Sequence, residues 1–422
     1  MGLHRKPIPV SEAAEKVMKY ARKGTKETVS INECDGRYLA EDIIADHDIP
    51  HFDRAPYDGF AIRAQDSEGA SQDNPVTFEV IEEIGAGSIA SNAVGDKKAI
   101  RIMTGAKMPE GSNAVVMLEL AKEFREDGKT YMSIKRGYKP GDNVSYKGAE
   151  TTEGDILVKK GRKINPGIKA VLATFGYAEV PVMKKPVVGL FATGSELLDV
   201  HEELEPGKIR NSNSYMMSSQ IVRAGGEVKY FGQLIDDLDI TYNSVKEMLK
   251  EVDCLVTTGG VAVGDYDHMP AIYERLGAEV LFNKVAMRPG SVTTVAQLDG
   301  KLLFGLSGNP SASYVGFEIY ARPVIQAMLE TDKPHLKKVT AELTADFPKA
   351  NPFTRFVRST IGFSDGRAVV EPSGMDKSNV VTSLINTNSL MILPGGTRGF
   401  ASGDMVEVLL LEDFEGSEWP WE

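Results

Sequence analysis

Cysteine is almost absent from this chain of 422 residues, and both cysteines, Cys34 and Cys254, lie in apolar surroundings. A disulfide framework and a thiolate metal site are therefore excluded, and the composition predicts a reducing, cytoplasmic environment. No apolar run is long enough to cross a membrane, and the opening MGLHRKPIPV lacks the apolar core of a signal peptide. The sequence also lacks the P-loop pattern, which disfavours a standard nucleoside triphosphatase.

The chain also has fewer basic than acidic residues. The chain has 48 Lys and Arg residues against 60 Asp and Glu residues, so its formal net charge is −12 at pH 7. This balance argues against a general nucleic-acid binder and against a protein of the membrane surface. An acidic protein that binds anionic ligands has to place cations locally or recruit a metal ion. With 42% hydrophobic and 26% charged residues, the chain has an ordinary globular composition and is long enough for two to four domains.

The stretch DCLVTTGGVAVGDYD is the most informative in the chain. Its apolar and β-branched run from Cys254 to Thr258 predicts a buried strand, which Gly259 and Gly260 end. Two acids, Asp265 and Asp267, follow the glycines. At the carboxyl end of a parallel strand, such glycines let backbone N–H groups approach an anion, and nearby acids can hold a metal ion. The alternative is a plain strand-to-helix turn with surface acids.

Strands and helices alternate between Val187 and Leu329, which predicts a doubly wound α/β domain. A carboxylate follows three successive predicted strands of this domain, at Glu196, Asp236 and Asp267. Because the carboxyl ends of parallel strands share one edge of a sheet, these acids are predicted to form one site.

Two cations come shortly after the acids, Lys284 and Arg288 in FNKVAMRPG. Their neighbours predict an extended segment and a turn, in which residues four apart face the same way, so that both cations can reach one ligand. The next strand, LLFGLSG, leads into the SGNP turn at 307–310, whose O–H and N–H donors at a helix start suit an anion. A solvated surface is the alternative for the two cations.

Short strands and glycine turns flank the α/β domain on both sides. They predict a small β-domain between Val76 and Asn143, and Asp58 and Thr104 lie at strand ends in the N-terminal half. Caps and turn hydrogen bonds explain the presence of these two residues as well as a functional role does. Regularly spaced strands from Pro334 to Glu422 predict a small β-barrel or sandwich, with Arg358 among its polar candidates.

Seven motifs occur in order along the chain: PYDGFAIR, RIMTGAKMPEGSNAVVM, FATGSELL, TTGGVAVGDYD, KVAMRPG, SGNPSAS and LPGGTRG. Together they resemble the molybdopterin molybdenumtransferases, which are the MoeA proteins of bacteria and the E-domain of gephyrin and its plant counterparts. The resemblance spans nearly the whole chain. It implies that molybdenum from molybdate is inserted into adenylylated molybdopterin with the help of Mg²⁺, which releases AMP and the molybdenum cofactor.

The resemblance also implies an assembly and partners. The expected assembly is an elongated homodimer, with a site between the α/β domain of one subunit and the N-terminal β-rich region of the other. A molybdopterin adenylyltransferase is expected to act one step earlier, and maturation proteins of molybdoenzymes are expected to act later. The expected domains are a MogA-like α/β domain (1–25 and 182–332), a mixed linker and dimerisation domain (26–48 and 145–181), a β-rich domain (49–144) and a C-terminal β-barrel (333–422).

The functional residues of the family are carried over by motif. Those implied to act in catalysis are Asp58, Thr104, Glu196, Asp236, Asp267, Lys284 and Arg288. Glu196, Asp236 and Asp267 are implied to hold Mg²⁺, which usually binds through one or two carboxylates plus water and phosphate. The substrate-binding candidates are Gly259, Gly260, Asp265, Pro289, Ser307, Gly308, Asn309, Pro310, Arg358 and Ser378.

Three positions depart from the pattern of the family. Arg288 replaces the lysine that many members have before Pro-Gly, which keeps the charge but offers a planar fork. Ser145, in NVSYKGAE, stands where an arginine is usual, and Phe353 stands where an arginine is frequent. The role of the 143–150 loop and the ligand contacts of the C-terminal domain are therefore open.

Three other functions also remain open. A pterin carrier or scaffold would bind the pterin without catalysing a reaction. Gephyrin, for example, also serves as an assembly platform in animals. A different phosphoanhydride-cleaving enzyme would act without molybdate. The related molybdopterin adenylyltransferase shares the TGG…GD loop but is usually a lone α/β domain, so the β-rich flanks weigh against it.

Overall fold

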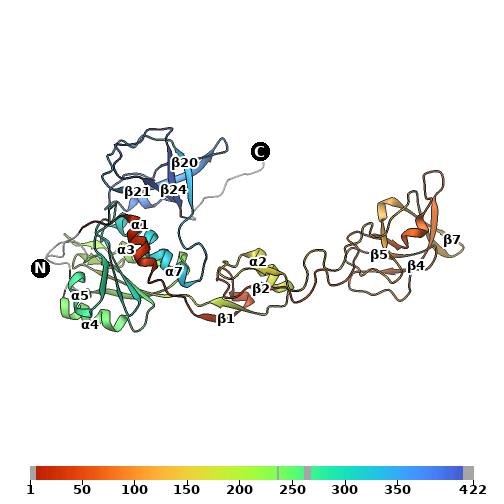
Figure 1. The fold of residues 1–422 in the computed structure, drawn as a ribbon, viewed down its shortest axis with the longest axis horizontal. Helices are drawn as coiled ribbons and strands as arrows, with labels where there is room; N and C mark the ends of the chain where they lie inside the picture. Colours follow the sequence, from red (N-terminus) through yellow and green to blue (C-terminus); the bar gives the residue numbers. More distant parts are fainter. Residues whose placement is uncertain (1–5, 235–236, 261–267, 412–422) are drawn as a thin grey trace. The chain divides into compact units, whose positions relative to one another are not determined.

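The computed structural model describes residues 6–234, 237–260 and 268–411 (Figure 1). Three of the predicted site residues, Asp236, Asp265 and Asp267, lie outside the described residues. The chain divides into two compact units. The first consists of Met1–Glu41, Lys160–Lys169 and Glu179–Glu422, and the second of Asp42–Lys159 and Ala170–Ala178.

A six-stranded sheet forms the centre of the first unit, in the spatial order β14-β11-β15-β19-β18-β16. The strands are β11 (Val187–Thr193), β14 (Glu227–Leu234), β15 (Cys254–Thr258), β16 (Glu279–Phe282), β18 (Thr294–Leu298) and β19 (Lys301–Leu306). The first four strands in this order are parallel, and β18 and β16 continue the sheet antiparallel. Parallel strands need crossover helices, and the chain supplies one after each of them.

Helices cover both faces of this sheet because its strands are apolar on both sides. Leu190 and Val256 pack into one hydrophobic cluster, and their sequence neighbours Phe191 and Leu255 pack into another on the opposite face. Figure 1 shows α4 and α5 together on one side and α1, α3 and α7 on the other. The helices are α1 (Val10–Met18), α3 (Ser212–Arg223), α4 (Leu238–Met248), α5 (Met269–Leu276), α6 (Pro310–Gly316), a π-helix (Phe317–Ala321) and α7 (Arg322–Met328).

A closed β-barrel follows α7 in the same unit. Its strands are β20 (Lys338–Leu343), β21 (Thr354–Ser364), β22 (Arg367–Pro372), β23 (Ser389–Leu393) and β24 (Met405–Leu410). The order β21-β22-β20-β24-β23 closes because β23 also pairs with β21. The two-residue strand β17 (Met287–Arg288) adds to β21, so the segment that carries the predicted cations joins the barrel. Alternate residues of the five strands fill the barrel interior.

The second unit contains a six-stranded sheet in the order β6-β3-β5-β4-β8-β7. Its strands are β3 (Gly59–Ile62), β4 (Val76–Ile84), β5 (Lys98–Ile102), β6 (Ala114–Met117), β7 (Ala121–Glu126) and β8 (Lys129–Ile134). Successive residues of β3 again alternate between two hydrophobic clusters, Phe60 and Ile62 in one and Ala61 in the other. This alternation buries both faces of the strand.

Short elements complete the fold. They are β1 (Lys26–Ser30) paired with β10 (Glu179–Met183), β2 (Ile43–Ile44) paired with β9 (Ile156–Val158), β12 (Leu197–Leu198) paired with β13 (Ile209–Arg210), the helix α2 (Pro166–Thr174) and the 3-10 turns Ile31–Glu33, Ala64–Ser67, Leu118–Leu120 and Thr382–Leu384. The predicted fold class, an α/β domain with β-rich N-terminal parts and a C-terminal β-barrel, is confirmed. The four domain boundaries remain a prediction.

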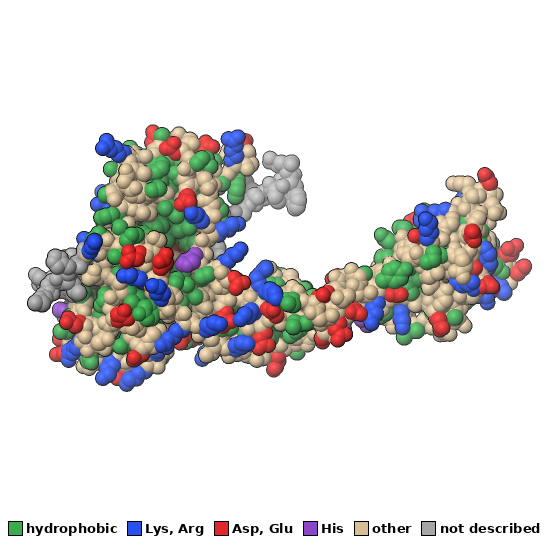
Figure 2. All heavy atoms as spheres, viewed as in Figure 1, with side chains coloured by type: hydrophobic (Ala, Val, Ile, Leu, Met, Phe, Trp, Pro, Cys, Tyr) green, Lys and Arg blue, Asp and Glu red, His purple; other side chains and the backbone are tan. Residues whose placement is uncertain are grey.

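Two general features bear on function. Acidic and basic side chains are interspersed over the face of the molecule in Figure 2, rather than sorted by sign. Within the described part of the chain, no helix combines the length and the apolar character needed to span a bilayer.

Candidate functional site

A cleft of about 670 Å³ opens at the carboxyl edge of the parallel strands in the first unit. It lies beside β11 and β15, where the connections diverge, because β11 leads to α3 on one face and β15 leads to α5 on the other. Such a topological switch point is where open α/β sheets bind ligands. We call it the switch-point cleft. Its lining includes Thr193, Gly194, Glu196, Asn211, Ser212, Asn213, Thr258, Gly259, Gly260, Ser307, Gly308, Asn309, Pro310, Asn379 and Val381.

The glycine pair predicted from the sequence forms the turn at the end of β15. Gly259 has φ +92° and Gly260 has φ +67°, in the left-handed region that favours glycine. A Cβ atom at Gly259 would lie 2.5 Å from the Thr193 carbonyl oxygen, and one at Gly260 would lie 2.7 Å from the Thr193 hydroxyl. The pair therefore lets β11 and β15 approach closely and leaves the space above them for a ligand.

We expect Gly259→Ala to destabilise the first unit. Backbone strain alone should cost about 1–3 kcal/mol, and the close contact of the new Cβ atom with the Thr193 carbonyl should add to this loss. A matched control is Gly277→Ala at the end of α5, where φ is +71° but nothing lies within 4 Å of an added Cβ. Chemical denaturation of both variants measures the difference. Equal losses in the free energy of unfolding would contradict the close approach.

Two residues that line the switch-point cleft each have a buried polar atom without a hydrogen-bond partner among the described residues. Asn213 is only 8% exposed, and its amide nitrogen donates to the Thr258 hydroxyl at 2.9 Å and to the Gly308 carbonyl at 2.8 Å. Its Oδ1 atom and the Thr193 hydroxyl are buried and have no hydrogen-bond partner among the described residues. Buried polar atoms normally have partners, so these two are suited to meet a bound ligand.

The amino terminus of α3 also faces the switch-point cleft. Asn211 caps this 12-residue helix, because its Oδ1 atom accepts a hydrogen bond from the Ser214 N–H at 3.2 Å. Ser212 and Asn213, in its first turn, line the cleft. The positive end of the helix dipole at this point favours a negatively charged ligand.

Several predicted site residues meet in this cleft. Those that line it are Glu196, Gly259, Gly260, Ser307, Gly308, Asn309 and Pro310. Glu196 is an exposed carboxylate, and among the described residues no three His, Cys, Asp or Glu side chains form a group that could hold a metal ion. A single carboxylate can still anchor Mg²⁺ when substrate phosphates and water supply the other ligands.

Lys284, Arg288 and Pro289 are not among the described residues that line the switch-point cleft. The backbone carbonyl of Lys284 accepts a hydrogen bond from the Ile8 N–H at 3.2 Å, and Arg288 pairs with Arg355 in β17 and β21. The side chain of Arg288 is exposed, and neither cation makes an ion pair with a described residue. Their predicted approach to the acids remains a prediction.

Arg358 and Ser378 belong to the barrel. Arg358 is 2% exposed, and its guanidinium donates to Asp376 Oδ1 at 2.9 Å and to the carbonyls of Met375 and Lys377. Ser378 directly precedes Asn379, which lines the cleft, although Ser378 and Arg358 do not. A direct contact of Arg358 with substrate therefore remains a prediction.

The second unit brings Asp58 and Thr104 together, although they lie 46 positions apart in the sequence. Asp58 Oδ1 accepts hydrogen bonds from the Thr104 backbone N–H at 2.6 Å and from its hydroxyl at 2.7 Å. These bonds hold the pKa of the Asp58 carboxyl below its usual value, with a smaller contribution from Arg101. Both side chains are exposed, so they form a fixed, ionised group at the surface of this unit.

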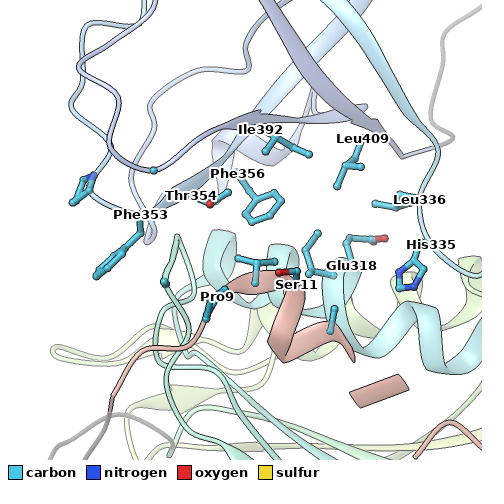
Figure 3. Close-up of a pocket in the computed structure, with 16 residues that line it drawn as sticks. Pro9, Ser11, Glu318, His335, Leu336, Phe353, Thr354, Phe356, Ile392 and Leu409 are labelled. Carbon is cyan, nitrogen blue, oxygen red and sulfur yellow. The ribbon is translucent and has the colours of Figure 1, made fainter. Parts of the chain in front are cut away.

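A second cavity lies beneath the barrel, against α1 and the π-helix (Figure 3). Its lining is largely apolar and includes Ile319, Leu336, Phe356, Ile392 and Leu409. Glu318 and His335 are labelled at one side of it in Figure 3, and of its lining only Gly395 comes from a glycine turn. We call it the apolar pocket, and its chemistry is less suited to a phosphate ester than that of the switch-point cleft.

The cysteines lie away from this chemistry. Cys254 begins β15 and is 2% exposed, and burial raises the pKa of its thiol to about 12. Burial also raises the pKa of the Cys34 thiol. Both groups are therefore protonated near neutral pH and are poor nucleophiles or metal ligands.

Comparison with known proteins identifies the family. Models of three regions match the chain: the MoeA N-terminal region (domain I and II) over residues 8–176, a probable molybdopterin binding domain over 189–327, and the MoeA C-terminal region (domain IV) over 340–411. The chain is 56% identical to the molybdopterin molybdenumtransferase of Bacillus subtilis, over 99% of this chain and 97% of that protein. The chain belongs to the MoeA family.

Other relatives agree. The molybdopterin molybdenumtransferase of Staphylococcus aureus strain MSSA476 is 49% identical over 98% of both chains. A crystal structure of the molybdopterin biosynthesis moeA protein from Pyrococcus horikoshii OT3 superimposes with a TM-score of 0.83 at 31% identity, covering 96% of this chain and all of that one. The family predicted from the seven motifs is thus confirmed.

Some residues of the cleft were not predicted from the sequence: Thr193, Asn211, Asn213 and Asn379. The repeated Asn-Ser pairs at 211–214 could have indicated the start of a helix, because such residues favour helix caps. Thr193 and Asn379 had no signal beyond their position next to predicted residues.

Proposed function

We propose that this member of the MoeA family inserts molybdenum from molybdate into adenylylated molybdopterin, with release of AMP, in an Mg²⁺-dependent reaction. The observation that carries the proposal is the switch-point cleft, because it combines a close-approach glycine turn with buried, unpartnered polar atoms. The likeness over full length to proteins named molybdopterin molybdenumtransferase supports the reaction type.

The residues of the cleft have roles that follow from their geometry. The amino terminus of α3 and the turn at Gly259 and Gly260 offer an anion site for the phosphates of the adenylylated substrate. The unpartnered Asn213 Oδ1 atom accepts a hydrogen bond from a ring N–H or amino group, and the Thr193 hydroxyl can donate or accept. Together these contacts orient a planar, polar ligand that carries phosphate.

Glu196, together with Asp236 and Asp267, which lie outside the described residues, would hold Mg²⁺ beside the phosphates. The chemistry that Mg²⁺ supplies when bound is neutralisation and polarisation of the phosphoanhydride oxygens. Lys284 and Arg288 would balance the charge of molybdate, which is a substrate. Asp58 and Thr104 would orient it or close the site from the other subunit of the proposed homodimer.

The test incubates the purified chain with adenylylated molybdopterin, Mg²⁺ and molybdate, and measures AMP. We expect AMP release that requires both molybdate and Mg²⁺. AMP release without molybdate would instead identify another phosphoanhydride-cleaving enzyme, and binding of the pterin without AMP would identify a carrier or scaffold. Adenylylation of molybdopterin from ATP would identify an adenylyltransferase.

The remaining expectations are part of the same proposal. A homodimer is expected from light scattering during gel filtration, and a monomer would exclude a site shared between subunits. The cytoplasmic location, the upstream adenylyltransferase and the downstream maturation proteins remain predictions, as does the absence of nucleic-acid and membrane partners.

A further inference from the structure

One loop of the barrel reaches into the switch-point cleft of the α/β domain. Residues 375–381, which we call the cleft loop, follow β22, and two of them, Asn379 and Val381, line the cleft. All other residues on its lining belong to the α/β domain or to the segment before the barrel. The position of Asn379 therefore depends on what holds this loop.

Asp376 fixes the cleft loop from the barrel side. One of its oxygens accepts a hydrogen bond from Arg358 at 2.9 Å, and the other accepts one from Arg355 at 2.7 Å. The three side chains are 5%, 1% and 10% exposed, respectively, so the carboxylate and both guanidinium groups are buried. Lys349 also approaches the carboxylate from the exposed side, at 3.4 Å. Burial lowers the pKa of Arg358, and the charge of Asp376 opposes that shift.

Arg358 also binds the loop backbone directly. Besides Asp376, its guanidinium donates to the carbonyls of Met375 at 3.3 Å and Lys377 at 3.2 Å, on both sides of the carboxylate. Charge-assisted hydrogen bonds of this kind are among the strongest in proteins. The barrel thus holds the first half of the cleft loop through one buried, hydrogen-bonded cluster of charged side chains.

Ser311, in the first turn of α6, holds the second half. Its backbone N–H donates to the Ser378 carbonyl at 3.0 Å, and its hydroxyl donates to the Val380 carbonyl at 2.9 Å. Ser311 itself is fully buried. Asn379 lies between these two bonded carbonyls in the sequence, and α6 begins at Pro310, the last residue of the SGNP turn.

We infer that Asp376 is a positioning residue, which locks the cleft loop between the barrel and α6 and thereby holds Asn379 in the switch-point cleft as a contact for the adenylylated pterin. The inference rests on the proposed function for the identity of that ligand. Asp376 itself does not line the cleft, so it acts through Asn379. Arg358 serves the same purpose through Asp376 and the loop backbone, and Arg355 through Asp376.

The test combines two measurements on the full chain carrying Asp376→Asn. Hydrogen exchange, followed by mass spectrometry, should show faster exchange in residues 375–381 with the rest of the barrel unchanged. The KM for adenylylated molybdopterin in the AMP-release assay should rise by about 10- to 100-fold, as expected when charged hydrogen bonds are lost, with a much smaller change in kcat. Asn379→Ala should raise KM similarly, and the double variant should be no worse than the single ones.

Two further variants keep the result interpretable. Asp404→Asn removes a carboxylate from another turn of the same barrel, where it accepts a hydrogen bond from the Ala401 N–H at 2.8 Å, and it should leave the cleft loop and KM unchanged. Ser311→Ala loosens the loop from the α6 side without leaving a buried charge, so it decides the question if Asp376→Asn does not fold.

Wild-type exchange at 375–381 in a folded Asp376→Asn variant would overturn the inference. A wild-type KM for Asn379→Ala, or additive effects in the double variant, would also overturn it. If the wild-type chain released no AMP, the proposed function would fail, but hydrogen exchange would still decide whether Asp376 locks the loop.

Discussion

Glu196→Gln is expected to lower molybdate-dependent AMP release by about 100-fold at limiting Mg²⁺, equivalent to roughly 3 kcal/mol. Glu196 is the only carboxylate on the lining of the switch-point cleft among the described residues. Glutamine keeps the size of the side chain but removes the charge that attracts a divalent cation. The Mg²⁺ concentration for half-maximal activity should rise, because weaker metal binding can be offset by more metal.

The matched control for this prediction is Glu203→Gln. Glu203 is exposed in the loop between β12 and β13 and is absent from the lining of the cleft. It should retain wild-type activity and Mg²⁺ dependence. An unchanged Mg²⁺ requirement in Glu196→Gln would remove Glu196 from the metal site, even if the rate fell.

Asp58→Asn is expected to reduce AMP release by about 10- to 100-fold, because it removes the charge of a fixed surface group. An asparagine oxygen can still accept both hydrogen bonds from Thr104, so the loop geometry should survive. Thr104→Val removes one donor but keeps the backbone N–H bond and the carboxylate charge. If charge rather than geometry matters, Asp58→Asn should be the more severe of the two variants.

The pH dependence gives a second readout for Asp58. Its pKa is held below the usual value by the Thr104 N–H and hydroxyl, so the carboxylate stays ionised at neutral pH. Its favourable interactions are present above the pKa of the unfolded chain and are lost as the pH falls through the lower pKa of the folded chain. Activity that depends on Asp58 should therefore be constant between pH 6 and 8, and any change with pH there must come from another group.

Asp53→Asn is the control in the same region of the second unit. Asp53 Oδ1 accepts a hydrogen bond from the Lys147 N–H at 2.8 Å, so it is also a carboxylate engaged in a turn. A loss of activity in Asp53→Asn as large as that in Asp58→Asn would indicate a general effect on this unit rather than a role for Asp58.

Features of the site that depend on residues close together in the sequence could be predicted from it. The run Cys254–Thr258 was predicted as a strand and forms β15 with the same bounds, because β-branched and apolar residues followed by two glycines determine it locally. The order of strands and helices predicted the doubly wound domain. Together these features placed the predicted site at the edge of the sheet where the switch-point cleft opens.

Contacts between distant segments were not accessible in the same way. The helix that carries Asn213 begins at Ser212, and its first turn lines the cleft, which the alternation of strands and helices did not indicate. Asp58 and Thr104 were each proposed alone, and their meeting follows from the pairing of β3 with β5. The motif marked Arg358, but its buried bond to Asp376 depends on side-chain packing that periodicity does not encode.

The most direct test of the account is a crystal structure of this chain with AMP bound, as the stable fragment of the adenylylated substrate. We expect the phosphate to lie at the Gly259–Gly260 turn and the amino terminus of α3, within hydrogen-bonding distance of cleft residues such as Asn213. AMP bound in the apolar pocket beside Phe356, with the switch-point cleft empty, would contradict it.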